Sequence, residues 1–221
     1  MGLLSVRDCA PVPDSGARPG NLREACIAEA RAIIARYGVE GLSLREVARR
    51  LGVSHQAPYR HFPTRDALLG EVVSQAFDSF AEHLAAGAQR SGGGMEQLAG
   101  LGRAYLEYAA AHPLEYALMF ATPLPDGDQH PVMVAAARRS FAILQACIDR
   151  LEPQAAPDAR QRDALFIWSM IHGLASMYQS GALQTLPLAP GVLGGMAEHV
   201  DGRIRAAFAA PAPGSDKGRT P

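Results

Sequence analysis

Lysine is nearly absent from this chain. Of the 21 basic residues only Lys217 is a lysine, so an arginine at any single position is weak evidence for a binding site. Charged residues make up 19% of the 221 positions and the net charge is −1. The bulk composition therefore indicates no particular partner. The hydrophobic content of 48% is enough for a sizeable core in one or two domains.

Cysteines and long apolar runs are also scarce. Cys9, Cys26 and Cys147 form an odd set without CxxC spacing, which is typical of a reducing compartment rather than of a disulfide framework. No apolar run reaches the roughly 18 residues of a membrane span, and the N-terminal stretch lacks the continuous apolar core of a secretion signal. We therefore expect a cytoplasmic protein.

The signatures of common enzymes are missing. The sequence has no GxSxG, P-loop or GxGxxG segment, and no histidine pair or cysteine cluster has metal-ligand spacing. Asp126, Asp128 and His130 share one segment, but a solvated turn is the simpler interpretation. We predict no catalytic site, no metal and no cofactor, and an enzyme acting on a small molecule is the weaker alternative.

Positive charge is concentrated near the N-terminus. Residues 1–70 carry ten arginines and seven acids, a balance of +3, whereas residues 71–221 have a balance of −4. A basic N-terminal part on an acidic body fits a module that binds a polyanion. The asymmetry is modest and needs support from a motif.

Apolar residues recur at helical spacing along most of the chain, and no alternating strand pattern is present. We predict an all-α fold of about nine helices, with an N-terminal three-helix lobe and a larger helical domain. The expected boundaries are a disordered arm at 1–20, the three-helix domain at 21–66, the larger helical domain at 67–210 and a disordered tail at 211–221.

Residues 43–65 have the length and punctuation of a helix-turn-helix. Ser43 can cap a short helix, and Gly52 can adopt the left-handed conformation that the turn requires. Ser54 can cap the next helix, which we expect to run to about Phe62 with its N-terminal end facing base edges. Thr64 can cap the helix that follows.

We predict that this segment contacts DNA. Gln56 can pair with adenine, and the small apolar Ala57 and Pro58 can touch a thymine methyl group. Arginines at helix starts, and the free N–H groups there, can bind the phosphates of the DNA backbone. The complete predicted set is Ser43, Arg45, Ser54, His55, Gln56, Ala57, Pro58, Tyr59, Arg60, His61, Thr64 and Arg65.

The motif GLSLREVARRLGVSHQAPYRHF, followed by PTRDALL, resembles the tetracycline-repressor (TetR/AcrR) family. The elements that recur together there are here Ser43, the turn at 51–54, Tyr59 with Phe62, and the exit at 62–69. Many relatives have a Lys-Gly-Thr-Leu-like segment where this chain has residues 55–58. The resemblance therefore implies DNA binding without indicating which bases are preferred.

The C-terminal part resembles a subgroup with a Trp…His-Gly signature, here Trp168, His172 and Gly173. Aromatic and methionine side chains from several predicted helices suit an apolar effector site, although an ordinary core is the alternative for each of them. The candidate set is Tyr105, Tyr108, Tyr116, Met119, Phe120, Phe141, Trp168, His172 and Met177.

The resemblance implies a homodimer formed through the last two helices, which binds double-stranded operator DNA and releases it when a small apolar or aromatic effector binds. Repression is favoured over activation. A helical adaptor that does not bind DNA is the rival interpretation.

Overall fold

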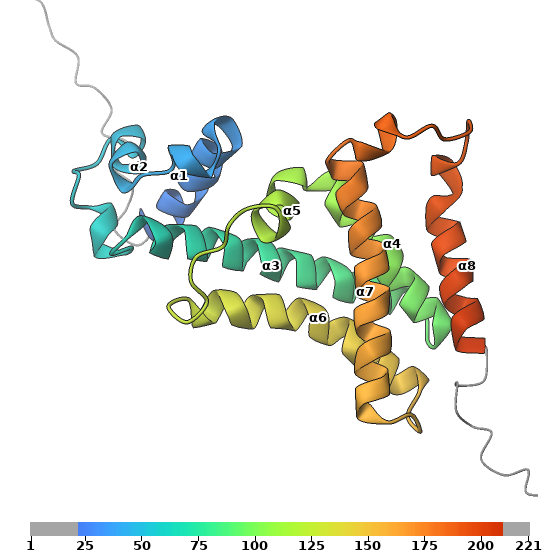
Figure 1. Cartoon of the computed structure of the whole chain (residues 1–221). Coiled ribbons are helices and arrows are strands. Elements are labelled where there is room, and N and C mark those ends of the chain that lie inside the picture. Colours follow the sequence, from blue (N-terminus) through green and yellow to red (C-terminus); the bar gives the residue numbers. More distant parts are fainter. Residues whose placement is uncertain (1–21, 210–221) are drawn as a thin grey trace, which may run out of the picture. The chain divides into compact units, whose positions relative to one another are not determined.

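The computed structural model of the chain describes residues 22–209 (Figure 1), and this range is helical with no strand. The all-α prediction is confirmed, with eight α-helices in the described range where about nine were expected. They are α1 (Leu22–Tyr37), α2 (Leu44–Leu51), α3 (Arg65–Arg90), α4 (Met95–Ala111), α5 (Pro113–Phe120), α6 (Pro131–Leu151), α7 (Pro157–Gln179) and α8 (Met196–Ala209). The predicted arm and tail lie outside the described residues.

Short 3-10 helices connect several of these elements. They are η1 (Val39–Gly41), η2 (Pro58–Arg60), η3 (Ala182–Thr185) and η4 (Leu193–Gly195). Backbone contacts divide the chain into two compact units between Leu68 and Leu69. Unit 1 holds α1, α2 and the start of α3, and unit 2 holds the remainder of α3 and everything after it.

The core of unit 1 forms between its first two helices. Ile27, Ile33 and Val47 are buried where α1 meets α2, whereas Tyr37, at the end of α1, is 52% exposed. Ser43 caps α2 by accepting a 3.1 Å hydrogen bond from the Glu46 N–H. Gly52 ends α2 with φ 67°, in the left-handed region where glycine has no steric penalty. The α2 helix and its turn therefore form as the sequence predicts.

The expected third helix of the motif is shorter and tighter than predicted. Residues 55–57 form turns, and only the 3-10 helix η2 follows. Hydrogen bonds run from Ala57 N to Ser54 O and from Arg60 N to Ala57 O, so each spans three residues. Pro58 has no N–H to donate to Ser54, which removes one bond of an α-helical ladder. The segment keeps a helical course without becoming an α-helix.

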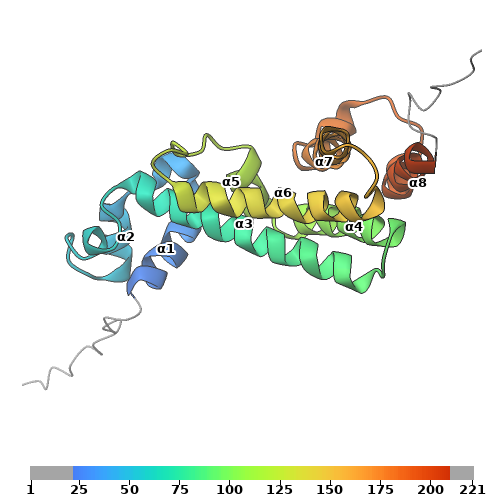
Figure 2. The same ribbon diagram turned by 90° about the horizontal axis from the view of Figure 1, so that it is seen from below.

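In unit 2, α7 crosses α6 and α4, with which it makes its main packing contacts, and α8 lies beside α7 (Figures 1 and 2). The crossing of α3 with α4 depends on two glycines. A Cβ atom at Gly100 would lie 2.8 Å from the Gly87 carbonyl oxygen, and one at Gly87 would collide with Ala104 Cβ. Ser91 Oγ donates to that Gly87 carbonyl at 2.9 Å. Glycine therefore permits a close backbone approach at this point.

The loop between α6 and α7 is held by a single guanidinium group. Arg160 Nη1 lies 2.8–3.5 Å from the carbonyl oxygens of Glu152, Pro153 and Ala155, and its Nε lies 2.8 Å from Asp149 Oδ1. These contacts tie the carbonyls of the loop that follows α6 to a side chain of α7.

The α6 helix is long and apolar enough to cross a membrane by length and composition alone. Its buried residues include Met133, Leu144 and Ile148, and it packs against α4 and α7. A core helix of a soluble protein passes the same test, so this finding is weak evidence for a membrane span.

Candidate functional site

The segment after the α2 turn presents polar side chains to solvent. Ser54, His55, Gln56, Arg60 and His61 are all exposed. Tyr59 is 41% exposed, and Ala57 is half-buried. An exposed run of hydrogen-bonding side chains after a helix and a tight turn is the arrangement expected of a DNA-reading element.

Two predicted DNA contacts have other roles. The Pro58 side chain is buried within unit 1, so it cannot meet a thymine methyl group. Arg65 donates from Nε to Leu42 O at 3.1 Å and from Nη2 to Val39 O at 2.6 Å, while Nη1 pairs with Asp66. The sequence pattern places Arg65 at a helix start but cannot show that its guanidinium tethers the preceding loop.

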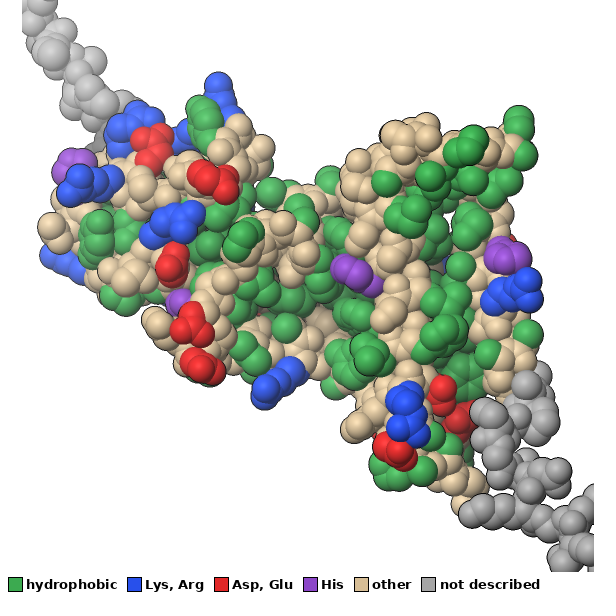
Figure 3. Space-filling view, in the orientation of Figure 1, with side chains coloured by type: hydrophobic (Ala, Val, Ile, Leu, Met, Phe, Trp, Pro, Cys, Tyr) green, Lys and Arg blue, Asp and Glu red, His purple; other side chains and the backbone are tan. Residues whose placement is uncertain are grey.

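The remaining predicted residues divide by role. Ser43 and Thr64 cap α2 and α3, since each hydroxyl accepts an N–H three residues further on. Both side chains are nevertheless exposed, as is Arg45. Figure 3 shows arginine and acidic side chains interspersed over unit 1.

A network of charges rigidifies α2 beside this segment. Glu46 accepts hydrogen bonds from Arg49 and Arg50 at 2.7–2.8 Å, and Arg50 also pairs with Glu29 of α1 at 3.1 Å. These bonds lower the pKa of Glu46 to about 2 and raise the pKa of both arginines. The carboxylate therefore stays ionised and α2 stays joined to α1.

In unit 2, three side chains from three helices meet at one nitrogen atom. The hydroxyls of Tyr105 (α4) and Tyr116 (α5) lie 2.8 and 3.0 Å from Nδ1 of His172 (α7). Tyr116 is also 3.1 Å from Ser176 Oγ. We call Tyr105, Tyr116, His172 and Ser176 the His172 cluster. Ser176 escaped the sequence prediction, although it lies on the same helix face as His172, four residues on.

The His172 cluster favours a neutral imidazole. A ring with its proton on Nε2 leaves Nδ1 free to accept from Tyr105, while Tyr116 donates to Ser176 or to the His172 carbonyl. Burial lowers the pKa of His172 and, with the neighbouring Tyr116, raises the pKa of Tyr105. All four groups can therefore be satisfied without any charge.

Aromatic rings enclose the cluster. The ring centroid of Phe80 of α3 lies 5.0–6.1 Å from the ring centroids of Tyr105, Tyr108, Phe120 and Trp168. The ring centroids of Phe120 and His172 lie 4.8 Å apart. Phe80 was not among the predicted candidates, because a single apolar position in a helical pattern gives no sign of its central place. The Tyr108 hydroxyl donates to Ala76 O and Met119 is buried, which are the contacts of a packed core.

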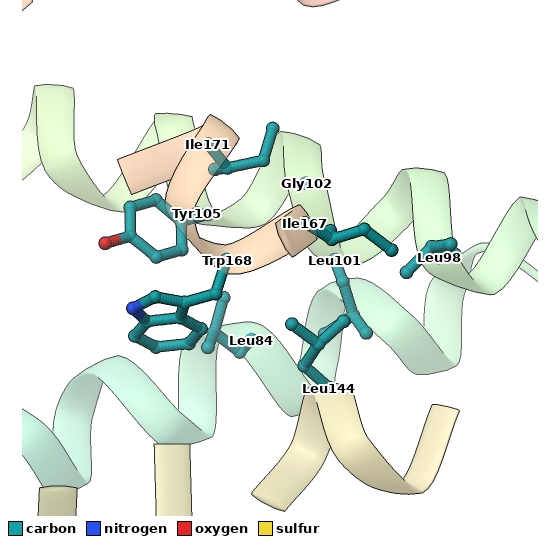
Figure 4. A pocket seen from close by; sticks show the side chains of 9 residues that line it. All are labelled: Leu84, Leu98, Leu101, Gly102, Tyr105, Leu144, Ile167, Trp168 and Ile171. Atoms are coloured by element: carbon teal, nitrogen blue, oxygen red, sulfur yellow. The ribbon is translucent and has the colours of Figure 1, made fainter. Parts of the chain in front are cut away.

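The cavity beside these rings is small. Its volume is about 20 Å³, which is close to the room needed by one water molecule. Figure 4 shows the Tyr105 ring above the Trp168 ring at this cavity, with Leu84 beside Trp168 and the Tyr105 hydroxyl pointing away. A larger effector would require the walls to move.

Met177 does not share this environment. Its side chain is 38% exposed, although it was predicted to line the same pocket as Trp168. Nine residues separate the two positions, and nine steps of an α-helix turn through about 180°. The two side chains therefore leave α7 on opposite faces.

The segment at 126–130 has a structural explanation. Asp126 accepts hydrogen bonds from Asp128 N and from Gln129 Nε2, both at 3.1 Å. His130 packs over Gly70, where an added Cβ atom would lie 2.9 Å from His130 Nδ1. Within residues 22–209, no group of three His, Cys, Asp or Glu side chains could hold a metal ion.

Comparison with known proteins agrees with a regulator built of a DNA-reading unit and a helical body. Residues 27–72 match the family model for bacterial regulatory proteins of the tetR family, and residues 98–193 match the tetracyclin repressor-like C-terminal domain. The chain belongs to the TetR family of transcriptional regulators. Regulators of this family bind operator DNA and dimerise, and they are not enzymes.

Individual relatives are more distant. The HTH-type transcriptional regulator Rv1816 of Mycobacterium tuberculosis (strain ATCC 25618 / H37Rv) is 31% identical over 91 residues, 40% of this chain and 39% of that protein. The match thus spans about two fifths of the length of this curated relative. The crystal structure of SCO4313, described as a regulatory protein, is 26% identical with a TM-score of 0.70, covering 85% of this chain and 97% of that chain.

A TetR-family transcriptional regulator from Bordetella parapertussis 12822 shares the fold. It is 21% identical with a TM-score of 0.58, and the alignment covers 83% of this chain and 94% of that chain. At this identity the likeness concerns the architecture of the helices and not the effector.

Proposed function

We propose that the protein is a cytoplasmic, ligand-responsive repressor that reads operator DNA with residues 54–61. The observation that supports this most directly is the exposed polar run of this segment, placed after the capped α2 helix in a chain of the TetR family. Tyr59, Arg60 and His61 are the side chains best placed to reach bases and phosphates. Gln56 is the candidate for adenine, and the buried Pro58 is left out of the contact set.

A gel shift with the DNA upstream of the protein's own gene tests this proposal. The Tyr59→Ala/Arg60→Ala variant is expected to lose operator binding, because it removes two exposed side chains for which no hydrogen bond or ion pair is found within residues 22–209. The matched control is Arg36→Ala, at an exposed arginine of α1, which should bind as the wild type does. Equal binding by both variants would remove residues 54–61 from the interface and favour an adaptor.

Dimerisation through α7 and α8 is the second part of the proposal. On α7, Phe166, Met177 and Tyr178 are 53%, 38% and 43% exposed, and Figure 3 shows hydrophobic side chains gathered over this part of unit 2. Exposed apolar side chains gathered in this way support an interaction site on α7. In a two-fold dimer the same patch of each copy would cover the other.

Sedimentation analysis tests the interface. Phe166→Glu places a charge in the proposed contact and is expected to give a monomer. Val132→Glu is the control, because Val132 is 64% exposed but belongs to α6. A Phe166→Glu protein that remains dimeric would place the interface elsewhere.

The effector is expected to act through the aromatic body of unit 2. The candidate residues are Tyr105, Tyr116, Phe120, Phe141, Trp168 and His172, which adjoin one another in space. Because the cavity among them is small, an effector would bind there only in a conformation whose walls have moved apart. An effector that prefers this conformation would shift the equilibrium away from operator binding. Operator release by apolar or aromatic compounds, followed in the same gel shift, is the test.

A further inference from the structure

A second, larger hollow lies on unit 2 beside the aromatic rings that enclose the His172 cluster. It is an open groove of about 770 Å³ between α3, α6 and α7. We call it the α6 groove. The residues that define it here are Phe77, Met133, Arg138, Phe141, Gln145 and Leu165. Its volume lies within the usual range for small-molecule sites, whereas the cavity at Trp168 is far smaller.

The α6 groove is apolar except at its polar edge. Phe77 comes from α3, Met133 and Phe141 from α6, and Leu165, which is 58% exposed, from α7. The polar residues of the lining are two glutamines and Arg138, so Arg138 is the single charged residue of this groove. A ligand that filled it would meet an apolar floor and one positive charge.

The guanidinium of Arg138 is available to a ligand. It is exposed, and within residues 22–209 no hydrogen bond or ion pair to it is found. The next residue behaves differently, because Arg139 forms an ion pair with Asp78 of α3. One acid, Asp128, borders the adjoining groove that Arg138 also lines. Of these two adjacent arginines of α6, Arg139 pairs with α3, and Arg138 lines the open groove.

From these observations we propose that the α6 groove binds an amphipathic monocarboxylate. The apolar body of the ligand would lie against Phe77 and Phe141, and its carboxylate would accept charge-assisted hydrogen bonds from Arg138. This inference rests on the proposed function, since it names the chemical class of the effector.

The groove also has a physical route to the DNA-reading unit. Phe141 lines the groove, and its ring centroid lies 5.6 Å from that of Trp168. Phe141 therefore joins the groove to the aromatic rings around the His172 cluster. Phe77 lies on α3, the same continuous helix that starts at Arg65 in unit 1. A ligand that presses on Phe77 therefore contacts an element shared by both units.

Binding can be measured with the full chain and without DNA. Trp168 is the only tryptophan in the sequence, so its fluorescence reports on the neighbourhood of Phe141. The probes are octanoate and octanamide, which share an acyl chain and differ in charge. The wild type is expected to bind octanoate about three- to tenfold more tightly than octanamide, the range for one partly exposed charge-assisted contact.

Three variants assign the preference to a residue. Arg138→Gln should bind both probes equally, whereas Arg138→Lys, which retains the charge, should keep most of the preference. Arg139→Gln is the matched control and should prefer octanoate as the wild type does. Equal binding of both probes by the wild type, a preference that survives in Arg138→Gln, or no binding of either probe would overturn the proposal.

The gel shift separates this inference from the proposed function. Octanoate that binds through Arg138 but does not release operator DNA would contradict ligand-responsive repression and leave the carboxylate site standing. Release by a neutral compound, with no carboxylate preference in the fluorescence assay, would leave repression standing and remove the carboxylate site.

Discussion

The hydroxyl of Tyr105 lies 2.8 Å from Nδ1 of His172, although the two residues are 67 positions apart in the sequence. With Tyr116, they tie α4, α5 and α7 together through one nitrogen atom. We expect His172→Phe to lower the free energy of unfolding by about 1–3 kcal/mol, because the buried hydroxyl of Tyr105 loses its ring acceptor. Urea denaturation measures this change. The exposed His55→Phe should stay within about 0.5 kcal/mol of the wild type.

The same histidine should give stability a dependence on pH. Burial lowers its pKa in the folded state below the ordinary value of 6.5, so at lower pH the unfolded chain binds the extra proton first. The free energy contributed by the neutral ring is present above pH 6.5 and is lost as the pH falls through the folded pKa. Denaturation between pH 7.5 and 5 should therefore show a steeper loss for the wild type than for His172→Gln. Parallel profiles would contradict this.

Arginine substitutions should separate fold from DNA contact. Arg65→Ala removes the hydrogen bonds to Val39 O and Leu42 O, and should cost about 1–3 kcal/mol of stability. Arg45→Ala should leave the melting temperature unchanged and weaken operator binding, because Arg45 is exposed. Thermal melts and gel shifts on the same samples check both expectations. A melting temperature unaffected by Arg65→Ala would refute its role as a tether.

Glycine positions in unit 2 should respond in opposite directions. Gly87→Ala is expected to destabilise the protein by about 1–3 kcal/mol, because the added methyl group collides with Ala104 where α3 crosses α4. At Gly102, in the middle of α4, the contact that a Cβ atom would meet is Ile171 Cδ1 at an ordinary 3.6 Å. Gly102→Ala should therefore stabilise by up to about 1 kcal/mol through helix propensity. Denaturant unfolding of the two variants distinguishes these outcomes.

Local rules accounted for much of unit 1. The cap at Ser43 and the left-handed Gly52 follow from residue chemistry at short range, and both are present. The third helix was predicted to run to about Phe62 and is instead a set of turns followed by the short 3-10 helix η2. In the structure Pro58 O accepts from His61 N and from Phe62 N, the bonds just before it span three residues, and its ring packs inward. Packing against the rest of unit 1 decided that orientation, and no sequence spacing encodes it.

Long-range chemistry was less accessible. The sequence signature identified Trp168 and His172, but it could not pair His172 with Tyr105 and Tyr116, which come from separate helices. Met177 was predicted beside Trp168, although helix geometry places the two about 180° apart. Arg138 carried no signal, since the sequence cannot distinguish it from Arg139, whose partner Asp78 lies 61 positions away.

The guanidinium of Arg160, which reaches three loop carbonyls and a carboxylate at once, has a consequence for protein engineering. A lysine there would keep the charge but provide only one ammonium group, which cannot span that set of acceptors. The same holds for Arg65, whose Nε and Nη2 serve two different carbonyls. Exchanging arginine for lysine throughout this chain would leave its net charge at −1 and yet loosen two of its connecting loops.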